Sequence, residues 1–211
     1  MASGSWYKSF AELSESEHEG VSYQRRVKRR RSKLAIIAPH GGGIEPGTSE
    51  IAASMAGLVF SYYVFDGRRK EGNELLHIAS TLFDEPKCLK LVHDSQVVIA
   101  IHGCAGEEKV VYVGGLHDRL KTRLIETMLK AGFDARLAEG NYAGLQSNNL
   151  CNCGRTGRGV QFEITEGLRR TMFRALNRPG RKMTTDVFRK FVAAIHKELI
   201  AITKEKAFEV E

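Results

Sequence analysis

The sequence has no long apolar segment. No run in its 211 residues approaches the roughly 20 apolar residues that a membrane-spanning helix needs. Its first ten residues, MASGSWYKSF, have neither the basic start nor the apolar centre of a signal peptide. We therefore expect no membrane association, and a soluble protein that is made in the cytoplasm and can act outside the cell after lysis.

Cysteine is scarce as well. Four cysteines in a chain of this size do not indicate a disulfide framework. Cys151 and Cys153 are separated by one residue, whereas structural zinc sites use C-x₂-C pairs. We interpret them as small side chains in a tight loop. The chain also lacks internal repeats and low-complexity segments.

The excess of positive charge is confined to one short segment. The formal net charge is +7, and residues 25–33 alone carry seven Lys and Arg side chains and no acid. The rest of the chain is therefore electrically balanced. We predict that residues 1–33 form a polar and basic leader before a domain at residues 34–211. Such a leader would attract anions by a long-range electrostatic attraction, which salt would screen. Nucleic-acid binding is the alternative, but no recognition motif accompanies the charge.

Apolar runs and helical patterns alternate along the remaining chain, and its 42% hydrophobic content is enough for one complete core. Strands are expected at residues 34–38, 61–65, 97–101, 110–113, 135–138 and 160–165. Helices are expected after Thr48 or Ser49, from Pro86 to His93 with Asp84 as the cap, and at residues 119–131, 168–176 and 185–206; a short one should end near Gly20. This alternation predicts a single α/β domain.

Two buried strands each deliver a histidine at their carboxyl end. His40 follows the run at residues 34–38, and His102 follows the run at residues 97–101. Three glycines and Glu45 come after His40, in a loop whose glycines would let backbone approach a ligand closely. Two imidazoles and one carboxylate leave Zn²⁺ an open position for water, as in catalytic zinc sites. Glu163, on a strand after a glycine-rich loop, is the candidate base.

Several motifs in this order resemble the poly-γ-glutamate hydrolase family of bacilli and their phages. The resemblance covers residues 34–170. It is carried by residues 38–50 (APHGGGIEPGTSE), Asp66-Gly67, Asn73, residues 76–78 (LHI), Phe83-Asp84 with Pro86, residues 101–104 (IHGC), residues 149–152 (NLCN) and residues 159–163 (GVQFE). It implies a mixed sheet flanked by helices, as in zinc carboxypeptidases. It also implies that His40, Glu45 and His102 bind zinc and that Glu163 is the catalytic carboxylate. The spacing here is His-x₄-Glu, whereas the carboxypeptidases themselves have His-x₂-Glu.

The implied substrate is a densely anionic polymer linked through side-chain carboxyl groups. Arg155 and Arg158, on the long polar loop at residues 140–159, are candidates for its carboxylates, because an arginine can clamp a carboxylate with two hydrogen bonds. His77 and Asn73 are candidates to support a metal ligand or to contact substrate. The sequence predicts no oligomeric state.

Two alternatives remain open. One is a related zinc amidase that acts on another acyl-glutamate or on a cell-wall peptide, because the zinc machinery would be shared and only the pocket would differ. The other is a non-enzymatic nucleic-acid-binding protein that uses residues 25–33.

Overall fold

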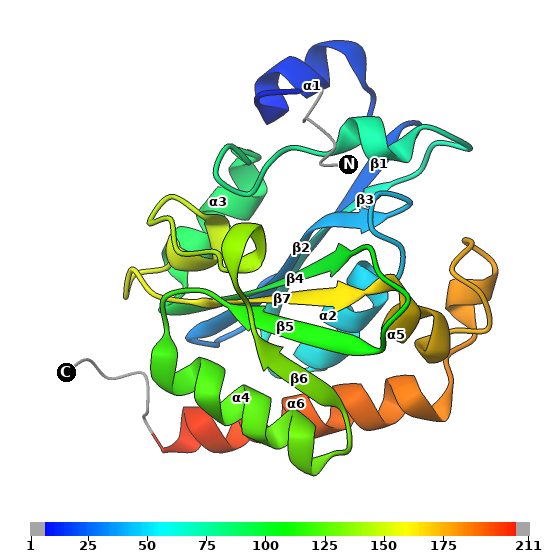
Figure 1. The fold of residues 1–211 in the computed structure, drawn as a ribbon. Coiled ribbons are helices and arrows are strands. Elements are labelled where there is room, and N and C mark those ends of the chain that lie inside the picture. Colours follow the sequence, from blue (N-terminus) through cyan, green and yellow to red (C-terminus); the bar gives the residue numbers. More distant parts are fainter. Residues whose placement is uncertain (1–6, 206–211) are drawn as a thin grey trace.

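A seven-stranded mixed β-sheet forms the centre of the structure, and helices cover both of its faces (Figure 1). This computed structural model describes residues 7–205. The strand order is β1-β3-β2-β4-β7-β5-β6, with β1 and β5 antiparallel to their inner neighbours. The strands are β1 (Tyr23–Lys28), β2 (Leu34–Gly42), β3 (Ser61–Gly67), β4 (Val97–Cys104), β5 (Val110–Gly114), β6 (Asp134–Leu137) and β7 (Val160–Thr165). The predicted α/β domain with a mixed sheet between helices is confirmed.

The two faces of the sheet belong to two hydrophobic cores. Along β2, Leu34 and Ile36 point to the larger core, whereas Ala35 and Ile37 point to the smaller one. Such alternation is the normal period of a strand. The larger core packs against α2 (Thr48–Ala56), α4 (Asp118–Lys130), α5 (Glu166–Met172) and α6 (Asp186–Lys204), and the smaller one against α1 (Phe10–Ser16) and α3 (Pro86–Asp94). We call these the α6 face and the α3 face.

A β-bulge in β2 decides which face receives His40. From Ala38 to Gly41 the strand advances three residues, whereas its partner β3 advances only two, from Val64 to Asp66. The extra residue reverses the alternation. His40 therefore lies on the α3 face, where its ring meets Ile78. Without the bulge, the period of two would have placed His40 on the α6 face.

The helix boundaries differ from the predicted ones where the terminal residues bond to another segment of the chain. Glu85, not Asp84, caps α3, because its carboxylate accepts hydrogen bonds from the amides of Lys87 and Cys88. Asp84 instead accepts a hydrogen bond from the Phe10 amide, at the start of α1. α5 ends at Met172, four residues before the predicted end, since Phe173 pairs with Thr184 in a β-bridge.

The ends of the chain differ from their predictions as well. The short helix expected to end near Gly20 is α1, which ends at Ser16. α6 extends to Lys204, and residue 206, its predicted end, lies outside the described residues.

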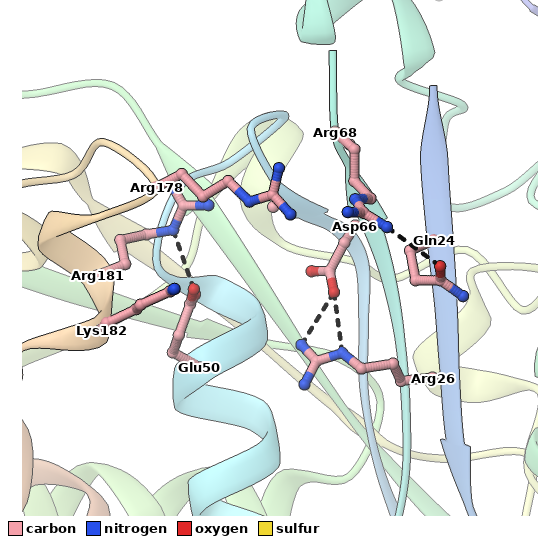
Figure 2. A pocket seen from close by; sticks show the side chains of 10 residues that line it. Gln24, Arg26, Glu50, Asp66, Arg68, Arg178, Arg181 and Lys182 are labelled. Carbon is pink, nitrogen blue, oxygen red and sulfur yellow. Dashed lines mark hydrogen bonds and ion pairs between the residues drawn. The ribbon is translucent and has the colours of Figure 1, made fainter. Parts of the chain in front are cut away.

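The first four residues of the basic segment, up to Lys28, belong to an edge strand. β1 pairs along its whole length with β3, so a division of the chain at residue 33 would separate paired strands. Arg25 is 2.7 Å from Glu85, Arg26 is 2.9 Å from Asp66 (Figure 2), and Arg29 is 2.9 Å from Asp94. These acids are 40 or more residues away in sequence. The charges of residues 25–33 alone therefore could not show that these three arginines are paired with acids. Among residues 7–205, no helix is long and apolar enough to cross a membrane.

Candidate active site

A cleft of about 460 Å³ lies on the α3 face, at the carboxyl ends of β2, β4 and β7. The carboxyl ends of parallel strands are where α/β proteins commonly bind ligands. Its polar lining consists of His40, Glu45, His77, Ser80, Thr81, His102, Asn141, Tyr142, Gln146, Asn149, Gln161 and Glu163, with Cys104 beside them. The cleft therefore collects titratable groups from five separate segments of the chain.

The three predicted metal ligands converge at one end of this cleft. His40 Nδ1 is 3.1 Å from Glu45 Oε1 and 3.1 Å from His102 Nδ1. His102 Nδ1 is 3.7 Å from Glu45 Oε2. The four-residue spacer still returns Glu45 to His40, because the Glu45 amide donates to the His40 carbonyl at 2.8 Å. The loop is thus a closed turn that holds both side chains together.

The segment after His77 orients both imidazole rings. His40 Nε2 lies 2.7 Å from the Ile78 carbonyl, which can only accept, so Nε2 is the donor there and Nδ1 faces the cluster. His102 Nε2 lies 3.3 Å from Ser80 Oγ. The two Nδ1 atoms and the Glu45 carboxylate thus face one point, an arrangement that a shared cation or proton must stabilise. Outer hydrogen bonds of this kind orient metal-binding histidines.

The electrostatics of Glu45 also favour a bound positive charge. Burial alone would raise its pKa, but the His40 charge and the hydrogen bonds from His102 and His40 outweigh burial, so the pKa lies well below its usual range. Burial would lower the pKa of His102, yet the hydrogen bond to Glu45 and the charge of Glu163 raise it. The Gly103 amide binds Glu45 Oε2 at 2.8 Å, which leaves Oε1 directed at His40. Glu45 is therefore a fixed carboxylate at neutral pH.

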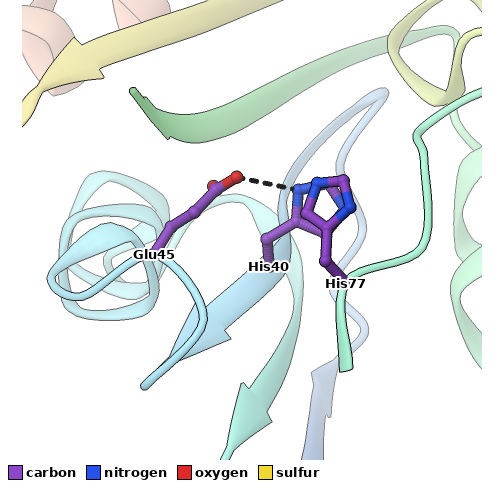
Figure 3. A group of neighbouring side chains, drawn as sticks. All are labelled: His40, Glu45 and His77. Atoms are coloured by element: carbon purple, nitrogen blue, oxygen red, sulfur yellow. Dashed lines mark hydrogen bonds and ion pairs between the residues drawn. The ribbon is translucent and has the colours of Figure 1, made fainter. Parts of the chain in front are cut away.

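His77 belongs to the same cluster (Figure 3). One ligand atom each from His40, Glu45 and His77 lie within 4.8 Å of one another, and the rings of His40 and His77 have centroids 4.0 Å apart. The nearby His40 charge, together with burial, lowers the pKa of His77 to about 3. His77 is thus a neutral imidazole at pH 7, which suits a metal ligand or a hydrogen-bonding group and not a cationic clamp for a carboxylate.

Glu163 lies beside His102 on the neighbouring strand. The two residues are partners in the parallel register of β4 and β7, so their side chains enter the cleft from the same face. Burial raises the pKa of Glu163 to about 7; His102 opposes this shift and the charge of Glu45 adds to it. A carboxyl group with a pKa near neutrality can both take and release a proton.

The long loop at residues 140–159 forms a wall of the cleft, through Asn141, Tyr142, Gln146 and Asn149. Gln161 holds it in place: its amide donates to the Tyr142 carbonyl at 2.8 Å and its oxygen accepts from Asn149 at 3.0 Å. Asn152 adds hydrogen bonds to the carbonyls of Gly144 and Gln146. The loop is therefore a fixed part of the site.

The three glycines after His40 were expected to let a ligand approach the backbone, but the structure gives them another role. A Cβ at Gly41 would lie 1.7 Å from Ser49 Oγ, and one at Gly42 would lie 2.4 Å from the Gly67 carbonyl. Gly42 also has a φ of 66°. These glycines let the loop pack closely against the end of β3. They do not bring a ligand close to the loop.

The structure does not bring the other predicted binding residues to the cleft. Arg155 and Arg158 lie in a turn whose backbone bonds to Ser95 and Gln96, just before β4 begins, whereas the cleft is at the other end of that strand. The Arg155 side chain donates to the His93 carbonyl. Asn73 is buried against Gly43 and Gly67 and donates to the Arg69 carbonyl at 2.8 Å. A substrate-binding role for these three residues has no support from their placement.

Cysteine chemistry does not fit this site. All four cysteines are free thiols. Burial raises the pKa of Cys104, in the cleft, to about 12, and that of Cys151 also to about 12. A thiol must be a thiolate to act as a nucleophile or metal ligand. Cys151 and Cys153 lie in a tight turn with Asn152, as predicted.

One buried residue that joins the segments of the cleft had no sequence signal. Arg169, on α5, is 4% exposed, and its guanidinium donates to the carbonyls of Pro46 at 2.7 Å, Cys104 at 3.0 Å and Ile164 at 3.0 Å. These carbonyls belong to the three segments that carry Glu45, His102 and Glu163. A buried arginine in an amphipathic helix looks like a surface residue in sequence, so nothing in the pattern marked it.

Replacing this arginine should loosen the whole site. We expect Arg169→Met to leave three buried carbonyls without donors and to lower the free energy of unfolding by about 3 kcal/mol. Affinity for divalent metal should fall by about 10- to 100-fold, as for other outer-sphere partners. Arg170→Met is the matched control, because Arg170 is an exposed neighbour that pairs with Glu107. Denaturant titration and metal titration of both variants test this; an unchanged metal affinity in Arg169→Met would refute the coupling.

The sequence matches a known protein family, described as poly-gamma-glutamate hydrolase, over residues 7–194. Among curated proteins it is 38% identical to YndL of Bacillus subtilis (strain 168) over 181 residues, which cover 84% of this chain and 71% of YndL.

Two solved structures share the whole fold. A bacteriophage poly-gamma-glutamate hydrolase superposes with a TM-score of 0.92 at 29% identity, covering 95% of this chain and 99% of the other. The zinc-free apo form of YndL superposes with a TM-score of 0.89 at 34% identity, covering 93% of this chain and 98% of the other.

Proposed function

Because the chain belongs to the poly-γ-glutamate hydrolase family, we propose that it is a zinc-dependent hydrolase that cleaves the γ-glutamyl amide bonds of poly-γ-glutamate. The observation that carries the proposal is the convergence of His40, Glu45 and His102, with the two Nδ1 atoms 3.1 Å apart. Family membership supports the hydrolase class, and the donor set supports the metal.

The donor set fits zinc. Two nitrogen ligands of a tetrahedral zinc ion, each about 2.0–2.1 Å from the metal, lie about 3.3 Å apart, close to the spacing of the His40 and His102 Nδ1 atoms. We assign His40, Glu45 and His102 as the ligands, and His77 as a neighbour that packs on His40. When bound, zinc would supply Lewis acidity toward water and the amide carbonyl.

Glu163 is the proton carrier in this proposal. Its pKa is about 7 in the metal-free chain and lower beside a bound cation, so it is ionised and can accept the proton of the attacking water as the new carbon–oxygen bond forms. It then delivers that proton to the amine nitrogen as the carbon–nitrogen bond breaks. Tyr142, Asn149 and Gln161 surround it with hydrogen-bonding groups, so the cleft offers polar contacts to a substrate backbone.

The alternative of a related zinc amidase differs only in substrate. The cleft lining contains amides, hydroxyls and imidazoles, which would also accept another acyl-glutamate or a cell-wall peptide. The basic segment, the feature behind the nucleic-acid alternative, has at least three of its arginines paired with acids.

A substrate panel separates these candidates. We expect rapid cleavage of γ-linked poly-glutamate, and no cleavage of α-linked poly-glutamate of the same length and charge. A cell-wall peptide with a γ-glutamyl bond serves as the third substrate. Faster cleavage of that peptide, or equal cleavage of the α-linked polymer, would point to the amidase instead. Amine release and polymer length are the measurements.

A further inference from the structure

A second pocket, of about 360 Å³, lies at the carboxyl ends of β2 and β3. Figure 2 shows Arg178, Arg181 and Lys182 entering it from one side and Arg26 and Arg68 from the other. Glu50, on α2, and Asp66, on β3, are the two acids in its lining. Five cations and two acids leave this pocket with an excess of three positive charges.

Three of these cations have no acidic partner among the described residues. Arg26 pairs with Asp66 at 2.9 Å and Arg181 with Glu50 at 3.0 Å, which uses both acids. Arg68 donates to the neutral amide of Gln24 at 3.3 Å. Arg178 and Lys182 are exposed, and within residues 7–205 neither side chain has an ion-pair or hydrogen-bond partner. The paired residues form the walls, and the unpaired cations face the solvent.

The catalytic cleft, in contrast, has no lysine or arginine in its described lining. The polymer of the proposed function carries one free carboxylate on every residue. A single metal ion cannot balance a row of such charges, so binding a long chain calls for cations beyond the cleft.

The two sites share one loop. Gly42 lines the basic pocket and Glu45 lines the catalytic cleft, so three residues, or about 10 Å of chain, separate them. A γ-linked glutamate repeat has five backbone bonds and extends by about 6 Å. The pocket lies on the α6 face, because Glu50 belongs to α2 and Asp66 lies on the same side of β3 as Val64. A polymer held in the cleft would therefore pass around the carboxyl edge of the sheet, and would reach the pocket several residues from the cut bond.

We propose that the pocket around Arg68, Arg178 and Lys182 is a second binding site for the polymer, which holds carboxylates several residues from the scissile bond. This inference rests on the proposed function. The pocket gives the enzyme affinity for long anionic chains, and the cleft provides the chemistry.

The test compares Arg178→Ala/Lys182→Ala with a matched control, Lys190→Ala/Lys197→Ala, which removes two exposed lysines of α6 outside the pocket. In the zinc-loaded protein, the pocket variant should raise KM for long poly-γ-glutamate by about tenfold. On a γ-linked dimer the loss should be much smaller. The control should behave as the wild type on both, and raising the salt concentration should reduce the difference between variants.

Binding gives an independent readout. In the Glu163→Gln background, titration with intact polymer should show the same tenfold loss for the pocket variant. Equal polymer affinity in pocket and control variants would overturn the second site even if the enzyme is fully active. A loss of duplex DNA binding without a loss of polymer binding would also overturn it. A wild-type chain that cuts no polymer would instead count against the proposed function, while polymer binding would still decide the pocket.

Discussion

Glu163→Gln is expected to lose about a thousandfold in kcat on poly-γ-glutamate while it binds zinc as the wild type does. A positioned general base contributes about 10²- to 10⁴-fold, and Glu163 is the cleft carboxylate that is not assigned to the metal. The amide of Gln keeps the size of the side chain but cannot accept the proton of water. Steady-state kinetics and metal analysis of the same preparation are the measurements.

The pH profile gives a second readout on the same residue. Glu163 must be ionised to act as a base, so activity falls as pH decreases through its pKa. That pKa is about 7 in the metal-free chain, and a bound cation nearby lowers it, so the acid limb of kcat/KM should lie below 7. Glu107→Gln, on an exposed carboxylate, is the control and should match the wild type. If Glu163→Gln kept most of its activity, another group would be the base.

His102→Ala is expected to abolish stoichiometric zinc binding, whereas His77→Ala should keep about one zinc per chain at saturation. His102 Nδ1 faces both His40 and Glu45, and His102 also has an outer partner in Ser80. His77 contacts the cluster by packing its ring against the ring of His40. Removing His77 should lower the affinity for zinc by about tenfold. Metal titration of both variants decides between the two histidines.

The unfolding temperature of each metal-free variant serves as the control for folding. Should His77→Ala lose zinc and His102→Ala keep it, the ligand set would be His40, Glu45 and His77 instead. That set is also compact, with its ligand atoms within 4.8 Å of one another.

The sequence could predict that His40, Glu45 and His102 lie close together because the relevant signals were local. An apolar run of five residues with a His-Gly pair at most one residue beyond it occurs twice, and parallel strands bring such ends to one edge of a sheet. In β7, Phe162 lies in the larger core and Glu163 lies in the cleft, which is the normal alternation of a strand. The face taken by His40 was not predictable in this way, since it depends on a bulge against β3.

The remaining differences between the predictions and the structure come from contacts between segments that are distant in sequence. Arg155 and Arg158 were candidates because they lie on the loop at residues 140–159. Their part of that loop binds the residues just before β4, at the opposite end of the strand from the cleft. The basic segment looked like a leader because its acidic partners are far along the chain. Arg169 acts through three backbone carbonyls, and no side-chain pattern encodes such a role.

One experiment decides the proposed chemistry: metal content and polymer length measured together on the purified wild-type chain. The structure-based proposal predicts about one zinc per chain and rapid shortening of poly-γ-glutamate. A chelator should stop the shortening, and added zinc should restore it. Polymer that shortens equally in the presence of the chelator, or that stays intact with a fully zinc-loaded chain, would contradict the proposal.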